Sequence, residues 1–141
     1  MSCPLCDTAG GTVLWRDATC RVVLADEPDY PGFLRVILAA HVKEMTDLAP
    51  ADQQHLLQVV LASEAALREV LQPDKINLAS LGNLVPHLHW HVIPRFADDP
   101  HFPGAVWGAR KHDIPHAVPA DAGERLAAVL TRRLGRARET G

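Results

Sequence analysis

The sequence lacks three features: a long apolar run, an excess of positive charge and a secretory signal. No apolar run reaches the length needed to span a membrane, so we expect no membrane association. The chain has 14 basic and 17 acidic residues, a net charge of -3, which argues against a nucleic-acid polymer as partner. Residues 1–7 lack the basic and apolar regions of a signal peptide, so we predict a cytoplasmic location.

Cysteine is scarce, and repeats and low-complexity segments are missing. The 141 residues contain three cysteines, which in the cytoplasm are more often thiols or metal ligands than disulfides. The length suits one domain over residues 1–141. We predict its core over about 3–108 and a C-terminal helical extension over about 121–138.

The most informative stretch is 87–95, which reads HLHWHVIPR. Successive side chains of a β-strand point to opposite faces, so the apolar residues share one face and the histidines share the other: His87, His89 and His91. Buried imidazoles need partners, and a row of three has no packing rationale. Such a row suits metal binding, acid–base chemistry or attack on phosphorus.

Hydrophobic patterning elsewhere predicts an α+β fold. One amphipathic helix is expected over 50–71, with Pro50 in its first turn, and a second helix near the C-terminus, outside the sheet. Together with the histidine stretch, short apolar segments predict an antiparallel sheet of about five strands: 13–15, 20–25, 33–38, 75–81 and 87–95. The irregular segment 96–108 carries aromatic residues that we expect to pack on another surface, such as a second subunit.

Cys3 and Cys6 form a CxxC pair ahead of the first strand. A redox pair is expected at a helix start after a strand, so metal binding is the better interpretation. Two unrelated thiols in an N-terminal tail remain an equal alternative. His41, just past a strand, is by itself more typical of a structural histidine.

Three short polar residues lie at strand ends or turns, where a ligand can reach them. Asp26 follows a strand and can bond a substrate hydroxyl, although a solvated turn residue fits the local pattern better. Ser80 and Asn83 flank Gly82 near the histidine row and can bond phosphate oxygens, or serve as turn residues.

The run HLHWHVI matches the pattern His-φ-His-φ-His-φ-φ, with φ apolar, of the histidine triad superfamily. The resemblance includes the following Pro94-Arg95 and extends back over the strands and long helix to Cys3. Residues 98–108 also resemble a bacterial subgroup of small histidine triad proteins labelled dinucleoside polyphosphate hydrolase-like.

The resemblance implies a nucleotide hydrolase or nucleotidyl transferase. By position, His89 would attack the α-phosphorus of a nucleotide conjugate and form a nucleotidyl-histidine. His91 would donate a hydrogen bond to the phosphate or protonate the leaving group, and His87 would orient the row or bind metal. The substrate would be a dinucleoside polyphosphate, a nucleoside phosphoramidate or a nucleotide sugar. Ser80 and Asn83 would face the phosphate and Asp26 the ribose.

The resemblance also implies a structural zinc ion and a twofold homodimer with a sheet continuous across the interface. Cys3, Cys6, His41 and His87 match the zinc ligands of some superfamily members, a closed tetrahedral set. The chain departs from the family where Phe33 replaces a histidine, and in its short loop 81–83 before the triad. Both departures concern substrate choice more than the nucleophile.

Three alternatives stand beside this hypothesis. A zinc-dependent hydrolase or hydratase would use the histidines as ligands, but 87–91 spans roughly 13 Å of strand, too far for one ion. A binding module would hold a nucleotide without turnover. A purely structural histidine row is the third.

Overall fold

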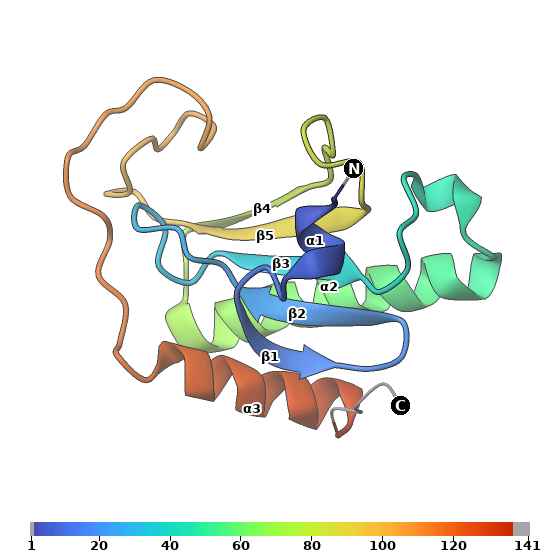
Figure 1. The fold of residues 1–141 in the computed structure, drawn as a ribbon. Helices are drawn as coiled ribbons and strands as arrows, with labels where there is room; N and C mark the ends of the chain where they lie inside the picture. Colours follow the sequence, from blue (N-terminus) through green and yellow to red (C-terminus); the bar gives the residue numbers. More distant parts are fainter. Residues whose placement is uncertain (1, 137–141) are drawn as a thin grey trace.

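The computed structural model describes residues 2–136, and the predicted helical extension to residue 138 therefore runs beyond the described part of the chain. The chain forms a five-stranded sheet with helices on both faces (Figure 1). In chain order the elements are α1 (Pro4–Asp7), β1 (Thr12–Arg16), β2 (Cys20–Leu24), β3 (Leu34–Leu38), the 3-10 turn η1 (Met45–Asp47), α2 (Pro50–Leu71), β4 (Lys75–Ala79), β5 (His89–Arg95) and α3 (Ala122–Leu134).

The sheet is antiparallel throughout, in the order β1-β2-β3-β5-β4. This confirms the predicted α+β class, and each observed strand lies at a predicted position. One boundary differs in a way that matters for the site. The last strand begins at His89, not His87, because the His87 N–H donates to the Val85 carbonyl (2.8 Å) and turns the chain before the sheet.

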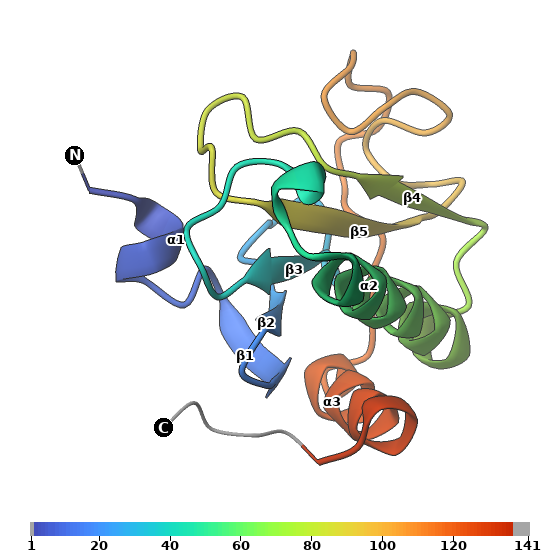
Figure 2. The same cartoon turned by 90° about the vertical axis from the view of Figure 1, so that its right-hand side faces the viewer.

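Both long helices cover one face of the sheet, and the short α1 lies on the other side (Figure 2). Helix α2 begins at Pro50 as predicted and buries the side of Leu56, Val60 and Leu67. Helix α3 packs beside α2 and against β1, outside the sheet as predicted, and Leu126 and Leu130 are fully buried in the main core. No helix in residues 2–136 is both long and apolar enough to cross a membrane.

The two faces of the sheet have different chemistry because side chains alternate along each strand. Val22 on β2 pairs with Val36 on β3, which pairs with Trp90 on β5, and this row packs on the helical side. The intervening residues, including His89 and His91, therefore point to the opposite face. That face carries the candidate site.

Candidate active site

The candidate site is a cavity of about 480 Å³ over the start of β5, on the face of the sheet that carries His89 and His91. The register of β3 and β5 sets its centre, with Ile37 opposite His89 and Arg35 opposite His91. Its lining residues come from α1, β3, β5, the loop before β5 and the segment after it: Leu5, Arg35, Leu81, Gly82, Asn83, Leu84, Val85, His89, His91 and Trp107.

His89 is held in one tautomer by the backbone of its own strand. Its Nδ1 lies 2.6 Å from the carbonyl oxygen of His87. A carbonyl only accepts hydrogen bonds, so Nδ1 carries the proton and Nε2 keeps the lone pair. A buried imidazole with a fixed ring and a free Nε2 lone pair is suited to attack an electrophile bound in the cavity.

His91 is held as a neutral ring of the opposite tautomer. The Arg35 Nε–H donates to His91 Nδ1 at 3.4 Å, and since a guanidinium only donates, the ring proton lies on Nε2. Burial, then the neighbouring His89 and Arg35, lowers the pKa of His91 to about 4. At neutral pH His91 is therefore a hydrogen-bond donor and not a proton source.

The low pKa of His91 predicts a midpoint near pH 4 in an imidazole NMR titration, against an ordinary value of 6.5. Between these values the unfolded chain binds a proton that the folded chain does not. The His91 contribution to the free energy of unfolding is therefore lost as the pH falls from 6.5 through 4. In Arg35→Gln the midpoint should rise, because one repelling charge is gone. A midpoint at or above 6.5 in the parent protein would contradict this environment.

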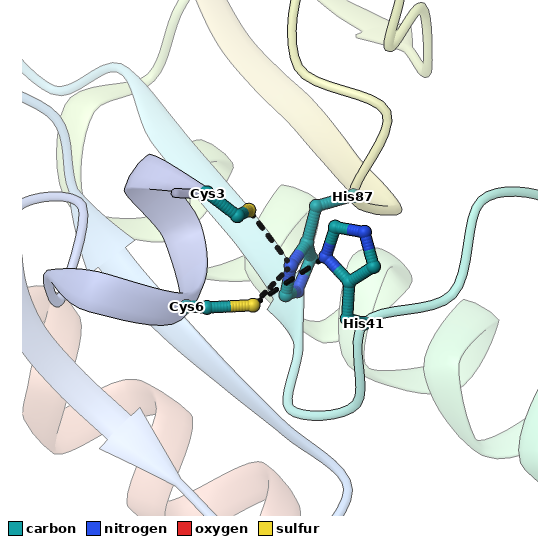
Figure 3. Close-up of side chains that lie close together, drawn as sticks. All are labelled: Cys3, Cys6, His41 and His87. Atoms are coloured by element: carbon teal, nitrogen blue, oxygen red, sulfur yellow. Dashed lines mark hydrogen bonds between the residues drawn. The ribbon is translucent and has the colours of Figure 1, made fainter. Parts of the chain in front are cut away.

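His87 is not among the residues that line the cavity and lies in a cluster with two cysteines and a second histidine (Figure 3). Its Nε2 lies 2.6 Å from the Leu38 carbonyl, so Nε2 carries the proton and Nδ1 the lone pair. That Nδ1 lies 3.5 Å from Cys3 Sγ and 3.4 Å from Cys6 Sγ. His41 likewise presents Nδ1 to Cys6 Sγ at 3.4 Å.

The four predicted metal ligands thus converge, with one donor atom each and all four atoms within 4.8 Å of one another. Two thiols and two imidazoles are the donor set of closed structural zinc sites. The Leu38 carbonyl supplies the outer-shell partner that fixes the tautomer of a ligating histidine. The residues fit zinc. Bound there, the ion would join α1 to the start of β5 and has no open position for chemistry.

A second group of metal-type donors lies away from the cavity: Asp17, Cys20 and His55. Asp17 already accepts the N–H groups of Thr19 and Cys20, and its other oxygen lies 2.6 Å from His55 Nε2. Cys20 is 1% exposed and packs in the main hydrophobic core. These hydrogen bonds of Asp17 connect the β1–β2 turn to His55 on α2, which explains why the three residues lie close together without a metal.

The predicted phosphate and ribose residues are only partly brought together. Asn83 lines the cavity. The Ser80 hydroxyl donates to the His89 carbonyl at 2.9 Å, and Ser80 is outside the cavity lining. Asp26 is exposed in the loop after β2 and is also outside the lining. Ser80 therefore stabilises the start of β5 through its hydrogen bond to the His89 backbone. The roles of Ser80, Asn83 and Asp26 in nucleotide binding stay predictions.

Three residues of the cavity wall that lie outside the loop before β5 were not predicted from the sequence. Arg35 is the charged residue of an otherwise apolar strand, a signal that was available. Leu5 lies between the two cysteines of α1, and its place on the wall follows from the folding of α1 against the sheet. Trp107 lies in the irregular segment, and its ring centroid is 5.9 Å from that of His91.

A buried ion pair holds the segment that carries Trp107. Arg95 Nε and Nη2 donate to the two oxygens of Asp99 at 2.8 and 3.1 Å, and Nη2 also donates to the Gly104 carbonyl at 2.7 Å. Burial opposes ionisation of Asp99, but Arg95 and backbone N–H groups outweigh it and lower the pKa of Asp99 to about 2. The aromatic segment thus packs on its own chain and completes the cavity.

Phe33, where the resemblance led us to expect a histidine, is 4% exposed and packs edge-on against His91, with ring centroids 5.5 Å apart. The side chain thus gives His91 an apolar neighbour. This surface helps to exclude water from His91 and favours its neutral form.

Comparisons with known proteins agree with this architecture. The sequence model described as HIT domain matches residues 8–98. A curated relative from Mycobacterium tuberculosis, AP-4-A phosphorylase, is 28% identical over 106 residues. The match covers 71% of this chain and 54% of that relative, so the chain spans about half the length of the relative.

Solved structures resemble the chain over most of its length. A histidine triad protein from Sinorhizobium meliloti is 32% identical with a TM-score of 0.70, and the match covers 89% of this chain and 91% of that one. A zinc-bound histidine triad family protein from Mycobacterium smegmatis is 25% identical with a TM-score of 0.67, covering 94% and 95%.

Proposed function

Because this chain belongs to the HIT domain family, we propose that it is an enzyme that cleaves nucleotide conjugates at the α-phosphate through a nucleotidyl-histidine on His89. The observation that carries the proposal is the tautomer of His89. Its Nδ1–H is fixed on the His87 carbonyl at 2.6 Å, which leaves Nε2 as the nucleophilic atom of a residue that lines the cavity.

The reaction has two displacements. In the first, the Nε2 lone pair of His89 forms a bond to the α-phosphorus, and the bond from phosphorus to the leaving oxygen breaks. His91 donates its Nε2–H as a hydrogen bond to oxygen at the reacting phosphate. In the second, an acceptor oxygen attacks phosphorus, the P–N bond breaks, and His89 regains its lone pair. The acceptor loses its proton to solvent.

The acceptor is water or inorganic phosphate. Water makes the protein a hydrolase, and phosphate makes it a nucleotidyl transferase. The name of the mycobacterial relative, AP-4-A phosphorylase, supports the inclusion of phosphate as an acceptor.

Product analysis with diadenosine tetraphosphate tests the reaction and identifies the acceptor. Attack at an α-phosphate by water is expected to give AMP and ATP, and with added inorganic phosphate ADP should appear in place of AMP. If ADP is the main product without added phosphate, the enzyme cleaves between the two central phosphates of the substrate. That result would contradict the proposal. Binding without any product, here and with adenosine 5′-phosphoramidate, would favour a nucleotide-binding module instead.

Zinc is proposed as a structural ion at Cys3, Cys6, His41 and His87, supported by their convergence and by the zinc-bound mycobacterial neighbour. The homodimer, the single domain and the cytoplasmic location stay predictions. A sheet continuous between two copies would have to use one of the two edge strands, β1 or β4.

A further inference from the structure

Arg35 places a permanent positive charge beside the catalytic histidines. It lies directly opposite His91 in the β3–β5 register, on the same face as His89, and lines the same cavity. Its Nε–H reaches His91 Nδ1 at 3.4 Å, and its guanidinium carbon lies 5.1 Å from the centroid of the Phe33 ring. The Phe33 ring and the strand backbone hold the guanidinium at the cavity wall.

No other lysine or arginine is among the described residues that line this cavity. The partner of Arg35 in the structure is Glu27, whose Oε1 lies 2.9 Å from Arg35 Nη2. The two side chains are 24% and 41% exposed, so water screens this pair and it contributes little to stability. A phosphate with more negative charge can displace Glu27 from the guanidinium at little cost.

We propose that Arg35 is an anion subsite for the phosphate chain on the leaving-group side of the α-phosphate, and that it favours polyphosphate over phosphoramidate substrates. The inference rests on the proposed attack by His89. Relative to the Ile37–His89 pair, the Arg35–His91 pair lies two residues further along the strands, roughly 6–7 Å. A phosphate group next to an α-phosphate at His89 is therefore within reach of Arg35 along this face.

The chemistry of the leaving group favours the same substrate class. An amine released from a phosphoramidate must acquire a proton, whereas a nucleotide phosphate departs as an anion and needs positive charge. His91 is neutral, since its pKa is lowered to about 4, so it supplies a hydrogen bond but no proton. Arg35 supplies the positive charge that a departing phosphate anion requires.

Binding measurements on the His89→Ala background test the subsite without turnover. Calorimetric titration is expected to show tighter binding of ATP than of AMP. Arg35→Gln should weaken ATP binding about 10- to 100-fold, as expected for a charged hydrogen bond, and AMP binding less than about 3-fold. Arg35→Lys keeps the positive charge but lacks the paired N–H donors of a guanidinium. It should therefore recover part of the ATP affinity that Arg35→Gln loses.

Two further variants sharpen the test. Glu27→Gln frees the guanidinium from its competing carboxylate, so ATP affinity should rise severalfold. Arg110→Gln is the matched control: it removes a guanidinium that pairs with Asp29 on the surface, with 42% and 43% exposure, outside the cavity. It should change neither affinity.

The outcomes separate this subsite from the proposed catalysis. Equal loss of ATP and AMP affinity in Arg35→Gln, no loss for either, or failure of the parent to bind ATP would overturn the subsite. A second outcome is that Arg35→Gln weakens ATP binding much more than AMP binding while the protein with His89 intact releases no product. That result would uphold the subsite and refute the catalytic proposal. In an active protein, Arg35→Gln should lower kcat/KM for diadenosine tetraphosphate at least tenfold more than for adenosine 5′-phosphoramidate.

Discussion

His89→Ala is expected to reduce turnover of diadenosine tetraphosphate by at least about 1,000-fold, with much smaller effects on nucleotide binding. The physical reason is that the variant lacks the atom that forms the covalent bond, and removal of a catalytic nucleophile typically costs several orders of magnitude in kcat. The measurement is steady-state product formation by chromatography, with nucleotide affinity measured in parallel. The side chain is buried at the cavity, so circular dichroism should confirm that the variant is folded.

The matched control is His112→Ala. His112 is exposed in the segment before α3 and lies outside the cavity lining, so its loss should leave turnover unchanged. Turnover in His89→Ala within tenfold of the parent would refute a histidine nucleophile at this position. A directly activated water would then replace the covalent mechanism.

The second large effect concerns the metal cluster. Cys3→Ser combined with Cys6→Ser is expected to abolish binding of one zinc per chain and to lower the Tm by roughly 10–15 °C. A ligand present at 1,000 times its Kd stabilises the folded state by about 4 kcal/mol, and for a chain of this size about 3–4 °C accompany each kcal/mol. Zinc content by elemental analysis and calorimetric melting at fixed free zinc provide the measurement.

Cys20→Ala is the control, because it removes the one cysteine outside the cluster. Its zinc content should equal that of the parent. Zinc that remains stoichiometric in the double variant would place the ion elsewhere and contradict this assignment. Melting in the presence of a strong chelator should bring the parent to the Tm of the double variant and leave the double variant unchanged.

The N-terminal helix connects the metal cluster with the cavity. Leu5 lies between Cys3 and Cys6 and lines the cavity, so two of the four proposed zinc ligands and a wall residue lie within four consecutive residues. Arg21 on β2 adds a second attachment, since its guanidinium donates to the carbonyls of Leu5 and Ala9, both at 2.8 Å. These hydrogen bonds hold α1 on the sheet independently of any metal.

The sequence predicted the strands and the long helix because their patterning is local. Period-two alternation located β5 within two residues, and Pro50 marked the start of α2. The convergence of Cys3, Cys6 and His87 followed from resemblance alone, since residues more than 80 positions apart share no local signal.

Other features depend on tertiary structure and were not predicted. Strand alternation suggested that all three histidines share one site. In the structure His87 precedes β5 and faces the cysteines, so the two histidines that line the cavity are His89 and His91. Arg35 became visible as a site residue only through its register with His91.

The most direct test of the account is intact-protein mass spectrometry after a brief, rapidly quenched reaction with diadenosine tetraphosphate. A covalent increase in mass equal to one AMP less one water is expected in the parent protein and should be absent from His89→Ala. Peptide mapping should place the label on 87–91. Product formation at the full rate with no adduct in the parent at any quench time, or an adduct that persists in His89→Ala, would contradict the central claim.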